Sequence, residues 1–184
     1  MKRIYTKYGF YFLLGFLIAL VIFSNTGKEK FIEPSGSMLK SSSNIVAVNN
    51  KGEGVFGRVN VEIIKGDGKV LVNTNPFLEP DTQYSANVAI KVAQDFTKKD
   101  LSKRDVIFDF DIETNVVGGP SAGAAMTLAL ISALEGKELK NSFVVTGTIM
   151  PDGSIGQIGG LVEKAEIANK LGVRTFIVPN GQSI

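Results

Sequence analysis

Hydrophobic and polar positions alternate along several stretches of the chain, as in half-buried β-strands. The strands predicted from this alternation and from β-branched content cover residues 44–48, 54–64, 69–73, 105–112, 142–149 and 174–179. Elsewhere the hydrophobic positions recur at helical spacing, which predicts helices over residues 80–96, 122–134 and 161–171. Strands come first and then alternate with helices, so the pattern predicts an α+β or mixed α/β domain.

An apolar run, residues 9–23, precedes these elements and carries no charge over fifteen residues. As a helix it spans about 22 Å, near the lower limit for crossing a membrane. Three interpretations remain: a retained anchor, a removed secretory signal or a buried helix. We favour the anchor, because no Ala-x-Ala-like cleavage site follows the run. Lys2, Arg3 and Lys7 precede it, which favours a cytoplasmic N-terminus with the domain outside. Cleavage would instead yield a secreted protein.

The predicted organisation therefore has three parts. Residues 1–24 form a membrane anchor or signal segment, and residues 25–44, rich in Ser, Gly and Lys, form a linker. Residues 45–184 form the folded domain.

Composition then narrows the chemistry. With 20 basic and 18 acidic residues, the chain has a formal charge of +2, so nucleic acid has no compositional support as a partner. It contains no cysteine and no histidine, which excludes disulfides, histidine or thiolate metal ligands, and histidine-based catalysis. Only carboxylates could hold a metal. Asp109, Asp111 and Glu113 alternate along one strand, but we interpret them as its exposed face, opposite Phe108, Phe110 and Ile112.

Ser121 follows Gly118, Gly119 and Pro120 and begins a helical stretch. A serine at this position commonly caps the helix. The same geometry also suits a nucleophile, because free N–H groups at the helix start can stabilise an oxyanion. The segment alone leaves both interpretations open.

Lys164 lies on the apolar side of the helix predicted over residues 161–171. At 100° per residue it falls between Ala168 and Leu171, whereas Glu163, Glu166 and Lys170 gather on another side. A snorkelling lysine would explain this position. A buried lysine would instead have a lowered pKa, and its neutral amine could accept a proton from a serine.

Three motifs resemble the proteolytic domain of Lon proteases: "GGPSAG" with Ser121, "VTGTI" with Thr146 and "IGGLVEKA" with Lys164. The resemblance extends over residues 45–182, and the separation of 43 positions from Ser121 to Lys164 matches the family's spacing. It implies the family's α+β fold of mixed sheets with packed helices, and a serine endopeptidase with a Ser–Lys dyad.

The resemblance also implies roles for single residues. Ser121 would attack the scissile carbonyl and Lys164 would carry the proton. Thr146 would orient the lysine amine by a hydrogen bond. N–H groups around Gly119 and Ser121 would form the oxyanion hole, and Gly160 would let the lysine helix turn tightly against the serine loop.

Several departures from the family pattern accompany the resemblance. Many members carry an acidic residue three positions before the serine, where this chain has Gly118, and a glutamate where it has Thr148. The chain has no Gly-Lys-Ser/Thr phosphate loop, so no cofactor is predicted and ATP would enter only through a separate ATPase acting in trans. The expected partners are unfolded or flexible polypeptides, the membrane and, by resemblance, further copies in a homo-oligomeric ring.

Two alternative functions remain at this stage. The first is a catalytically inactive Lon-like scaffold or interaction domain, against which the retention of both Ser121 and Lys164 argues. The second is a type I signal peptidase with Ser37 of "EPSGSML" as nucleophile, although the other motifs of that family are absent.

Overall fold

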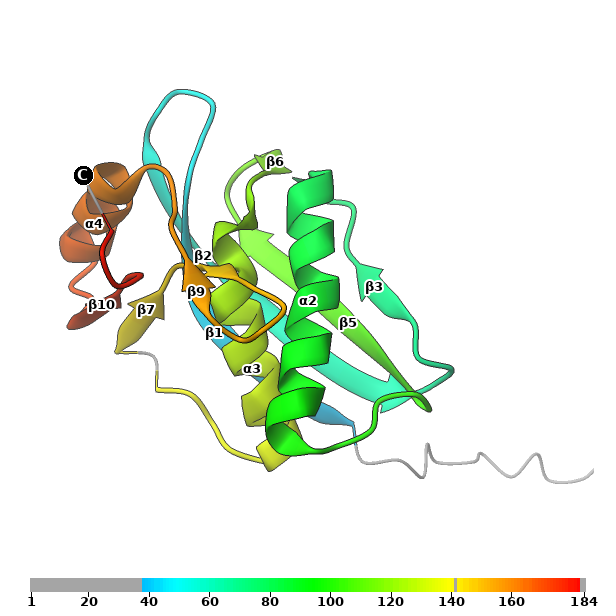
Figure 1. Cartoon of the computed structure of the whole chain (residues 1–184). Helices are drawn as coiled ribbons and strands as arrows, with labels where there is room; N and C mark the ends of the chain where they lie inside the picture. The colour runs from blue at the N-terminus through cyan, green and yellow to red at the C-terminus, as the bar shows by residue number, and fades with distance from the viewer. Residues whose placement is uncertain (1–37, 141, 183–184) are drawn as a thin grey trace, which may run out of the picture. The chain divides into compact units, whose positions relative to one another are not determined.

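The computed structural model describes residues 38–140 and 142–182, which lie in one compact unit. Its largest element is a four-stranded sheet in the order β1-β2-β5-β3 (Figure 1). The strands are β1 (Leu39–Val48), β2 (Gly54–Lys65), β3 (Val70–Val72) and β5 (Arg104–Ile112). The β1–β2 and β2–β5 pairs are antiparallel, and β3 is parallel to β5. This mixed sheet with packed helices agrees with the predicted α+β class.

The alternation along β5 determines which face of the sheet is buried. Phe108, Phe110 and Ile112 lie in the core, while Asp109 and Asp111 are exposed. The interpretation of these carboxylates as the outer face of a strand is therefore confirmed. Within residues 38–140 and 142–182, no group of acidic side chains is arranged to hold a metal ion.

Two helices cover one face of the sheet. They are α2 (Pro80–Thr97) and α3 (Gly123–Glu135), which contact each other while α3 also contacts β1 and β2 (Figure 1). Ten of the thirteen residues of α3 are buried, so this helix forms the centre of the core. Small side chains such as Ala125 and Ala129 let it pack closely.

Three two-stranded ladders complete the fold. In two of them the strands are parallel: β4 (Phe77–Leu78) with β6 (Val116–Val117), and β7 (Phe143–Val145) with β10 (Thr175–Ile177). In the third, β8 (Thr148–Ile149) and β9 (Ile155–Gly156) are antiparallel. The single strand predicted over residues 142–149 is thus wrong, since β7 and β8 belong to different sheets.

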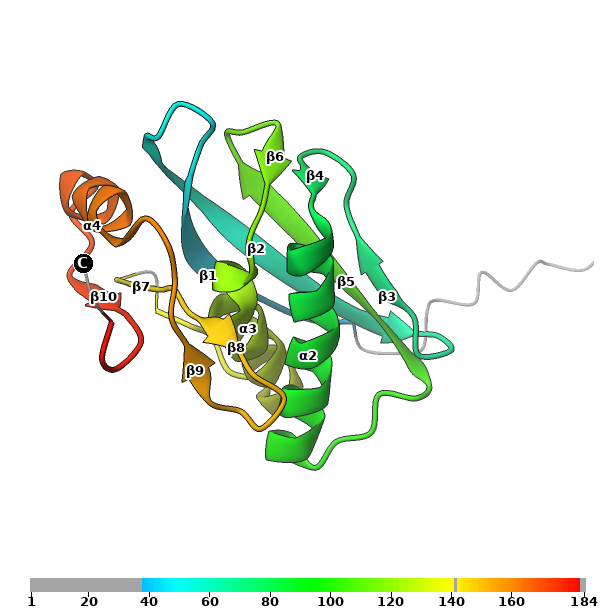
Figure 2. The ribbon, with the colours of Figure 1, turned by 45° about the horizontal axis from the view of Figure 1, so that its top comes forward.

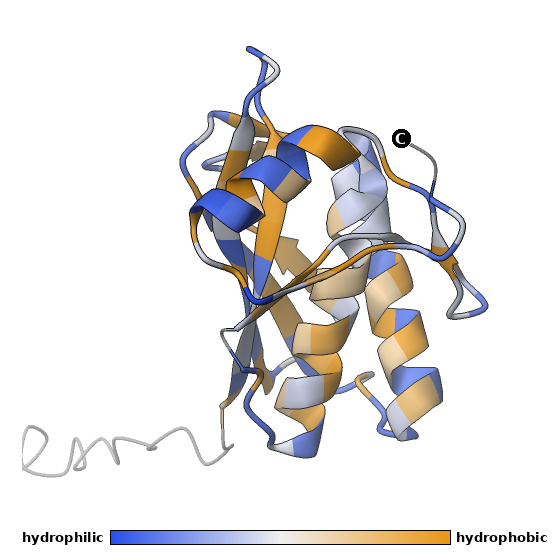
Figure 3. Ribbon diagram, turned by 90° about the vertical axis from the view of Figure 1, so that its left-hand side faces the viewer, coloured by the Kyte–Doolittle hydropathy of each residue, from blue (hydrophilic) through white to orange (hydrophobic). Residues whose placement is uncertain are grey.

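The third helix, α4 (Leu161–Lys170), lies beside the end of the β1–β2 hairpin (Figure 2). Its approach depends on Gly54, the first residue of β2. A Cβ at Gly54 would lie 2.2 Å from the backbone carbonyl oxygen of Glu163, so a glycine is needed for this contact. In Figure 3 the residues of α4 have mixed hydropathy, as expected of a helix with one face on the domain.

The predicted boundaries of the N-terminal parts are only partly within the described residues. Strand β1 begins at Leu39, inside the range predicted as linker. The apolar run at residues 9–23 lies outside the described residues, as does Ser37. Among residues 38–140 and 142–182, no helix is both long and apolar enough for a membrane span.

Candidate active site

Ser121 lies in a short 3-10 turn, Pro120–Ala122, immediately before α3. Gly119 precedes the turn with a φ of 75°, a conformation that favours glycine, and Pro120 supplies the fixed φ suited to a first helical position. Gly119 occupies the capping position of the 3-10 turn and Ala122 that of α3, and neither makes a side-chain capping hydrogen bond. Ser121 lies inside the 3-10 turn and occupies neither capping position. The interpretation of Ser121 as a helix cap is therefore wrong.

The segment between β7 and β8 holds the serine turn on one side. The N–H of Gly147 donates to the carbonyl of Ser121 at 2.8 Å, and the N–H of Ala124 donates to the carbonyl of Gly147 at 3.0 Å. The hydroxyl of Thr146 also donates to the Ser121 carbonyl, at 3.3 Å. The first two bonds engage both backbone polar groups of Gly147, which explains why the predicted strand is interrupted there.

Helix α2 holds the turn on the other side. The buried hydroxyl of Thr82 lies 3.0 Å from the carbonyl of Gly119 and 3.3 Å from that of Val117. These contacts fix the backbone that leads into the serine. The sequence does contain a signal for this residue, because Thr82 shares the helical face of Ala86, Ala89 and Ala93, where a polar side chain needs a partner.

Helix α4 brings Lys164 to the serine. The lysine side chain is only 4% exposed, so it is buried rather than snorkelling. Its Nζ lies 2.9 Å from the Oγ of Ser121, within hydrogen-bonding distance across 43 residues of sequence. No ion pair to Lys164 is found among the described residues.

Burial also changes the acidity of this amine. Loss of hydration lowers the pKa of Lys164 from 10.5 to about 8, although the nearby Glu163 carboxylate raises the pKa in part. At neutral pH a useful fraction of the amine is therefore uncharged. A neutral amine at 2.9 Å from a hydroxyl can accept its proton.

A pocket of about 240 Å³ opens at this pair. It is lined by residues from the end of β1, the serine turn and the start of α4: Ala47, Val48, Gly118, Ser121, Gly159, Gly160, Glu163 and Lys164. The pocket gives the serine hydroxyl access to a ligand while its lysine partner stays buried.

Comparison with known proteins assigns the domain to a family. Residues 46–183 match the model of the Lon protease (S16) C-terminal proteolytic domain. The chain belongs to this family. A Lon protease of Desulfatibacillum aliphaticivorans is 32% identical over 134 residues, 70% of this chain and 16% of that protein. An archaeal Lon protease of Methanocaldococcus jannaschii is 36% identical over 85 residues, 46% of this chain and 13% of that protein. The chain thus spans less than a fifth of either relative.

Two supporting residues of the Lon motifs have contacts other than those expected. Thr146, which is 1% exposed, bonds to the backbone of Ser121 rather than to the lysine amine. Gly160 begins α4 with a φ of 65°, but the group close to it is Val48 of β1: a Cβ at Gly160 would lie 2.6 Å from Val48 Cγ2. The glycine therefore brings the lysine helix against β1, not against the serine turn.

The acidic position missing from the Lon motif has a counterpart in space. A Cβ at Gly118 would lie 2.1 Å from Oε2 of Glu79, the residue before α2. The Glu79 carboxylate thus takes the space in which a side chain at position 118 would begin. No sequence pattern marks this residue, because the two-residue ladder β4–β6 that aligns it with Gly118 is too short to leave one.

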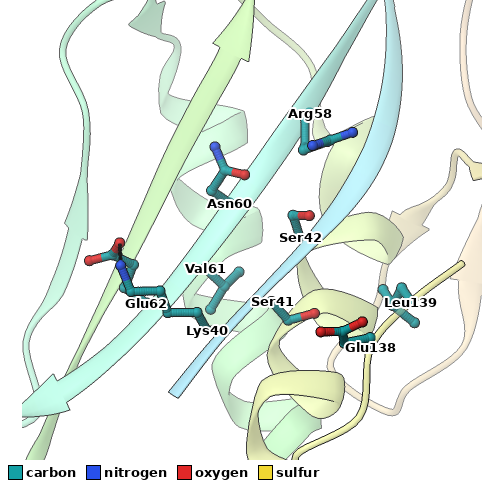
Figure 4. Close-up of a pocket in the computed structure, with 9 residues that line it drawn as sticks. All are labelled: Lys40, Ser41, Ser42, Arg58, Asn60, Val61, Glu62, Glu138 and Leu139. Carbon is teal, nitrogen blue, oxygen red and sulfur yellow. Dashed lines mark hydrogen bonds and ion pairs between the residues drawn. The ribbon is translucent and has the colours of Figure 1, made fainter. Parts of the chain in front are cut away.

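Two larger pockets of the described domain lack the nucleophile. One lies over β1, β2 and the segment after α3 and is lined mainly by polar side chains, among them Ser42, Arg58 and Glu138 (Figure 4). Another, of about 520 Å³, is apolar and lies between α2, α3 and the β7–β10 ladder. Neither includes Ser121 or Lys164, so the pocket at the serine is the candidate active site.

Proposed function

We propose that this chain is a serine endopeptidase that hydrolyses peptide bonds of unfolded or flexible polypeptides. Ser121 is the nucleophile and Lys164 is the general base. The observation that carries the proposal is the 2.9 Å contact between a buried, pKa-lowered amine and a hydroxyl that opens on a pocket. Membership of the Lon proteolytic family supports the same reaction class.

In the acylation step, Ser121 Oγ bonds to the carbonyl carbon of the substrate and its proton passes to the neutral Lys164 Nζ. The resulting ammonium gives that proton to the leaving nitrogen as the C–N bond breaks, which leaves an ester on Ser121. In deacylation, a water oxygen attacks the ester, Lys164 takes the water proton, and the proton returns to Ser121 Oγ as the acid product leaves. Lys164 thus ends each cycle neutral.

The oxyanion of each tetrahedral intermediate needs donors near Ser121. The first N–H groups of a helix have no acceptor within that helix, and the helix dipole adds positive potential there. In this chain Gly119 precedes the 3-10 turn Pro120–Ala122 and Ser121 lies at its start, so neither N–H has an acceptor within the turn, which supports their role as the oxyanion hole.

The proposal extends to assembly and location. The chain works as a homo-oligomer, which the resemblance implies, and ATP takes part only where a separate ATPase acts on the same substrates in trans. Residues 9–23 anchor it, with the N-terminus cytoplasmic and the catalytic domain outside.

Cleavage of an unfolded protein such as casein tests the peptidase. The full chain in mild detergent should produce peptides, and Ser121→Ala and Lys164→Ala should each abolish them. Ser37→Ala should cleave like the wild type, and loss of cleavage in this variant would instead support the signal peptidase alternative. Inertness of the wild type in every oligomeric form would favour a non-catalytic scaffold.

A further inference from the structure

The pocket at Ser121 has an acidic border that the dyad chemistry does not use. Glu163 lines the pocket directly, one residue before Lys164. Gly118 also lines it, and the carboxylate of Glu79 lies against Gly118, with Oε2 2.1 Å from the position that a Cβ would take. Two carboxylates from different helical elements, the start of α2 and the first turn of α4, therefore border one small pocket.

Neither carboxylate is committed to another partner within the described residues. Glu79 precedes α2 but its side chain makes no capping hydrogen bond, while its backbone N–H donates to Val117 at 3.0 Å. None of the ion pairs of the described domain involves Glu79 or Glu163. The basic residue among those lining the pocket is Lys164, which must be uncharged to act as a base. A substrate side chain entering the pocket therefore meets net negative charge.

We propose that Glu79 and Glu163 are specificity-determining residues, which make the pocket prefer a basic substrate side chain and disfavour an acidic one next to the scissile bond. The inference rests on the proposed peptidase function and names its substrate class. Attraction to a partly solvated carboxylate changes affinity by about two- to fivefold, and repulsion of a like charge acts in the opposite direction. Both glutamates together should separate basic from acidic substrates by about tenfold or more.

Paired fluorogenic peptides measure this preference. Two peptides differ only by Lys or Glu beside the scissile bond, placed in one pair before the bond and in another pair after it. Mass spectrometry verifies that the same bond is cut. For the wild-type full chain we expect the kcat/KM ratio of the Lys to the Glu peptide to be about ten in at least one pair. Glu79→Gln and Glu163→Gln should each lower this ratio by about two- to fivefold.

The ratio separates specificity from catalysis. Glu163 also influences the pKa of Lys164, but a change in the base affects both peptides of a pair equally and cancels in the ratio. Matched controls come from the same helices: Asp81→Asn on α2 and Glu166→Gln on α4 remove exposed acids that do not line the pocket, and should leave the ratio unchanged. In the unmutated protein, the ratio should fall as salt rises from about 0.05 M to about 0.5 M, because screening weakens the charges.

The outcomes are distinguishable. An active wild type with a ratio near one, or a ratio that neither glutamine variant changes, overturns the specificity inference and leaves the peptidase proposal intact. A wild type that cleaves no peptide, under conditions where the chain is folded, overturns both.

Discussion

Replacing Lys164 with methionine should stabilise the folded protein while it abolishes cleavage. Burial lowers the pKa of Lys164 from 10.5 to about 8, so the unfolded chain binds more protons than the folded chain between these two values. Stability therefore rises with pH across this window, and the full penalty is present below about pH 8. At 1.36 kcal/mol per pKa unit, the lysine destabilises the fold by about 3 kcal/mol at pH 7.

Methionine has a similar length and no charge, so Lys164→Met removes this penalty. The variant loses the hydrogen bond to Ser121, worth about 1 kcal/mol, which leaves an expected gain of about 2 kcal/mol at pH 7. For a chain of this size, that gain corresponds to a Tm higher by about 4–8 °C. The gain should shrink as pH rises and disappear near about pH 10, where the remaining lysine penalty has fallen to the roughly 1 kcal/mol contributed by the lost hydrogen bond.

Urea unfolding at pH 7, 8, 9 and 10 measures this difference in the free energy of unfolding. Lys170→Met is the matched control, because Lys170 is exposed on the same helix, and its effect should stay within about 0.5 kcal/mol at every pH. A Lys164→Met variant that is less stable than the wild type at pH 7, or whose advantage does not change with pH, would refute a buried lysine with a lowered pKa.

Three further predictions concern the same site. The rate of peptide cleavage should rise about tenfold from pH 7 to pH 9, following deprotonation of Lys164 with a midpoint of about 8, and a flat initial-rate profile would contradict this base. Gly54→Ala should destabilise the fold by about 1–3 kcal/mol in thermal unfolding and reduce cleavage, because its Cβ would lie 2.2 Å from the Glu163 carbonyl oxygen and push α4 away. A variant with unchanged stability and cleavage would contradict this close contact. Thr146→Val should lower the free energy of unfolding by about 1 kcal/mol and slow cleavage, because it loses the bond to the Ser121 carbonyl. Thr146→Ser keeps the hydroxyl and should have the stability and cleavage rate of the wild type. A serine variant as impaired as the valine variant would argue against a role for the hydroxyl in holding the serine turn.

The elements that could be predicted from sequence are those whose pattern is local and long. Alternation over residues 105–112 predicted β5, and helical spacing predicted α2, α3 and α4 to within a residue or two of their observed ends. The apolar position of Lys164 on α4 was visible for the same reason, since it depends on the positions of neighbours within one helix.

Interactions across long stretches of chain were not predictable in this way. The run around Thr146 has the β-branched composition of one strand, yet the Gly147 N–H bonds to Ser121 and divides the run between two sheets. A Cβ at Gly147 would also lie 2.4 Å from Ile155, so the glycine serves close packing. Local propensity is here overridden by tertiary hydrogen bonds.

The pairing of Glu79 with Gly118 shows how a ladder of two residue pairs can decide the surroundings of an active site. Strands β4 and β6 align Leu78 with Val117, and the next residues along each strand are Glu79 and Gly118. An acidic side chain at position 118 would meet the Glu79 carboxylate both sterically and as a like charge. Glycine at 118 and glutamate at 79 are therefore a matched pair: this member of the Lon family has no acid in the serine motif itself, but it keeps a carboxylate beside the motif from the start of α2. Gly118→Asp should therefore lower the free energy of unfolding less in a Glu79→Gln background than in the wild type, because the glutamine removes the like charge.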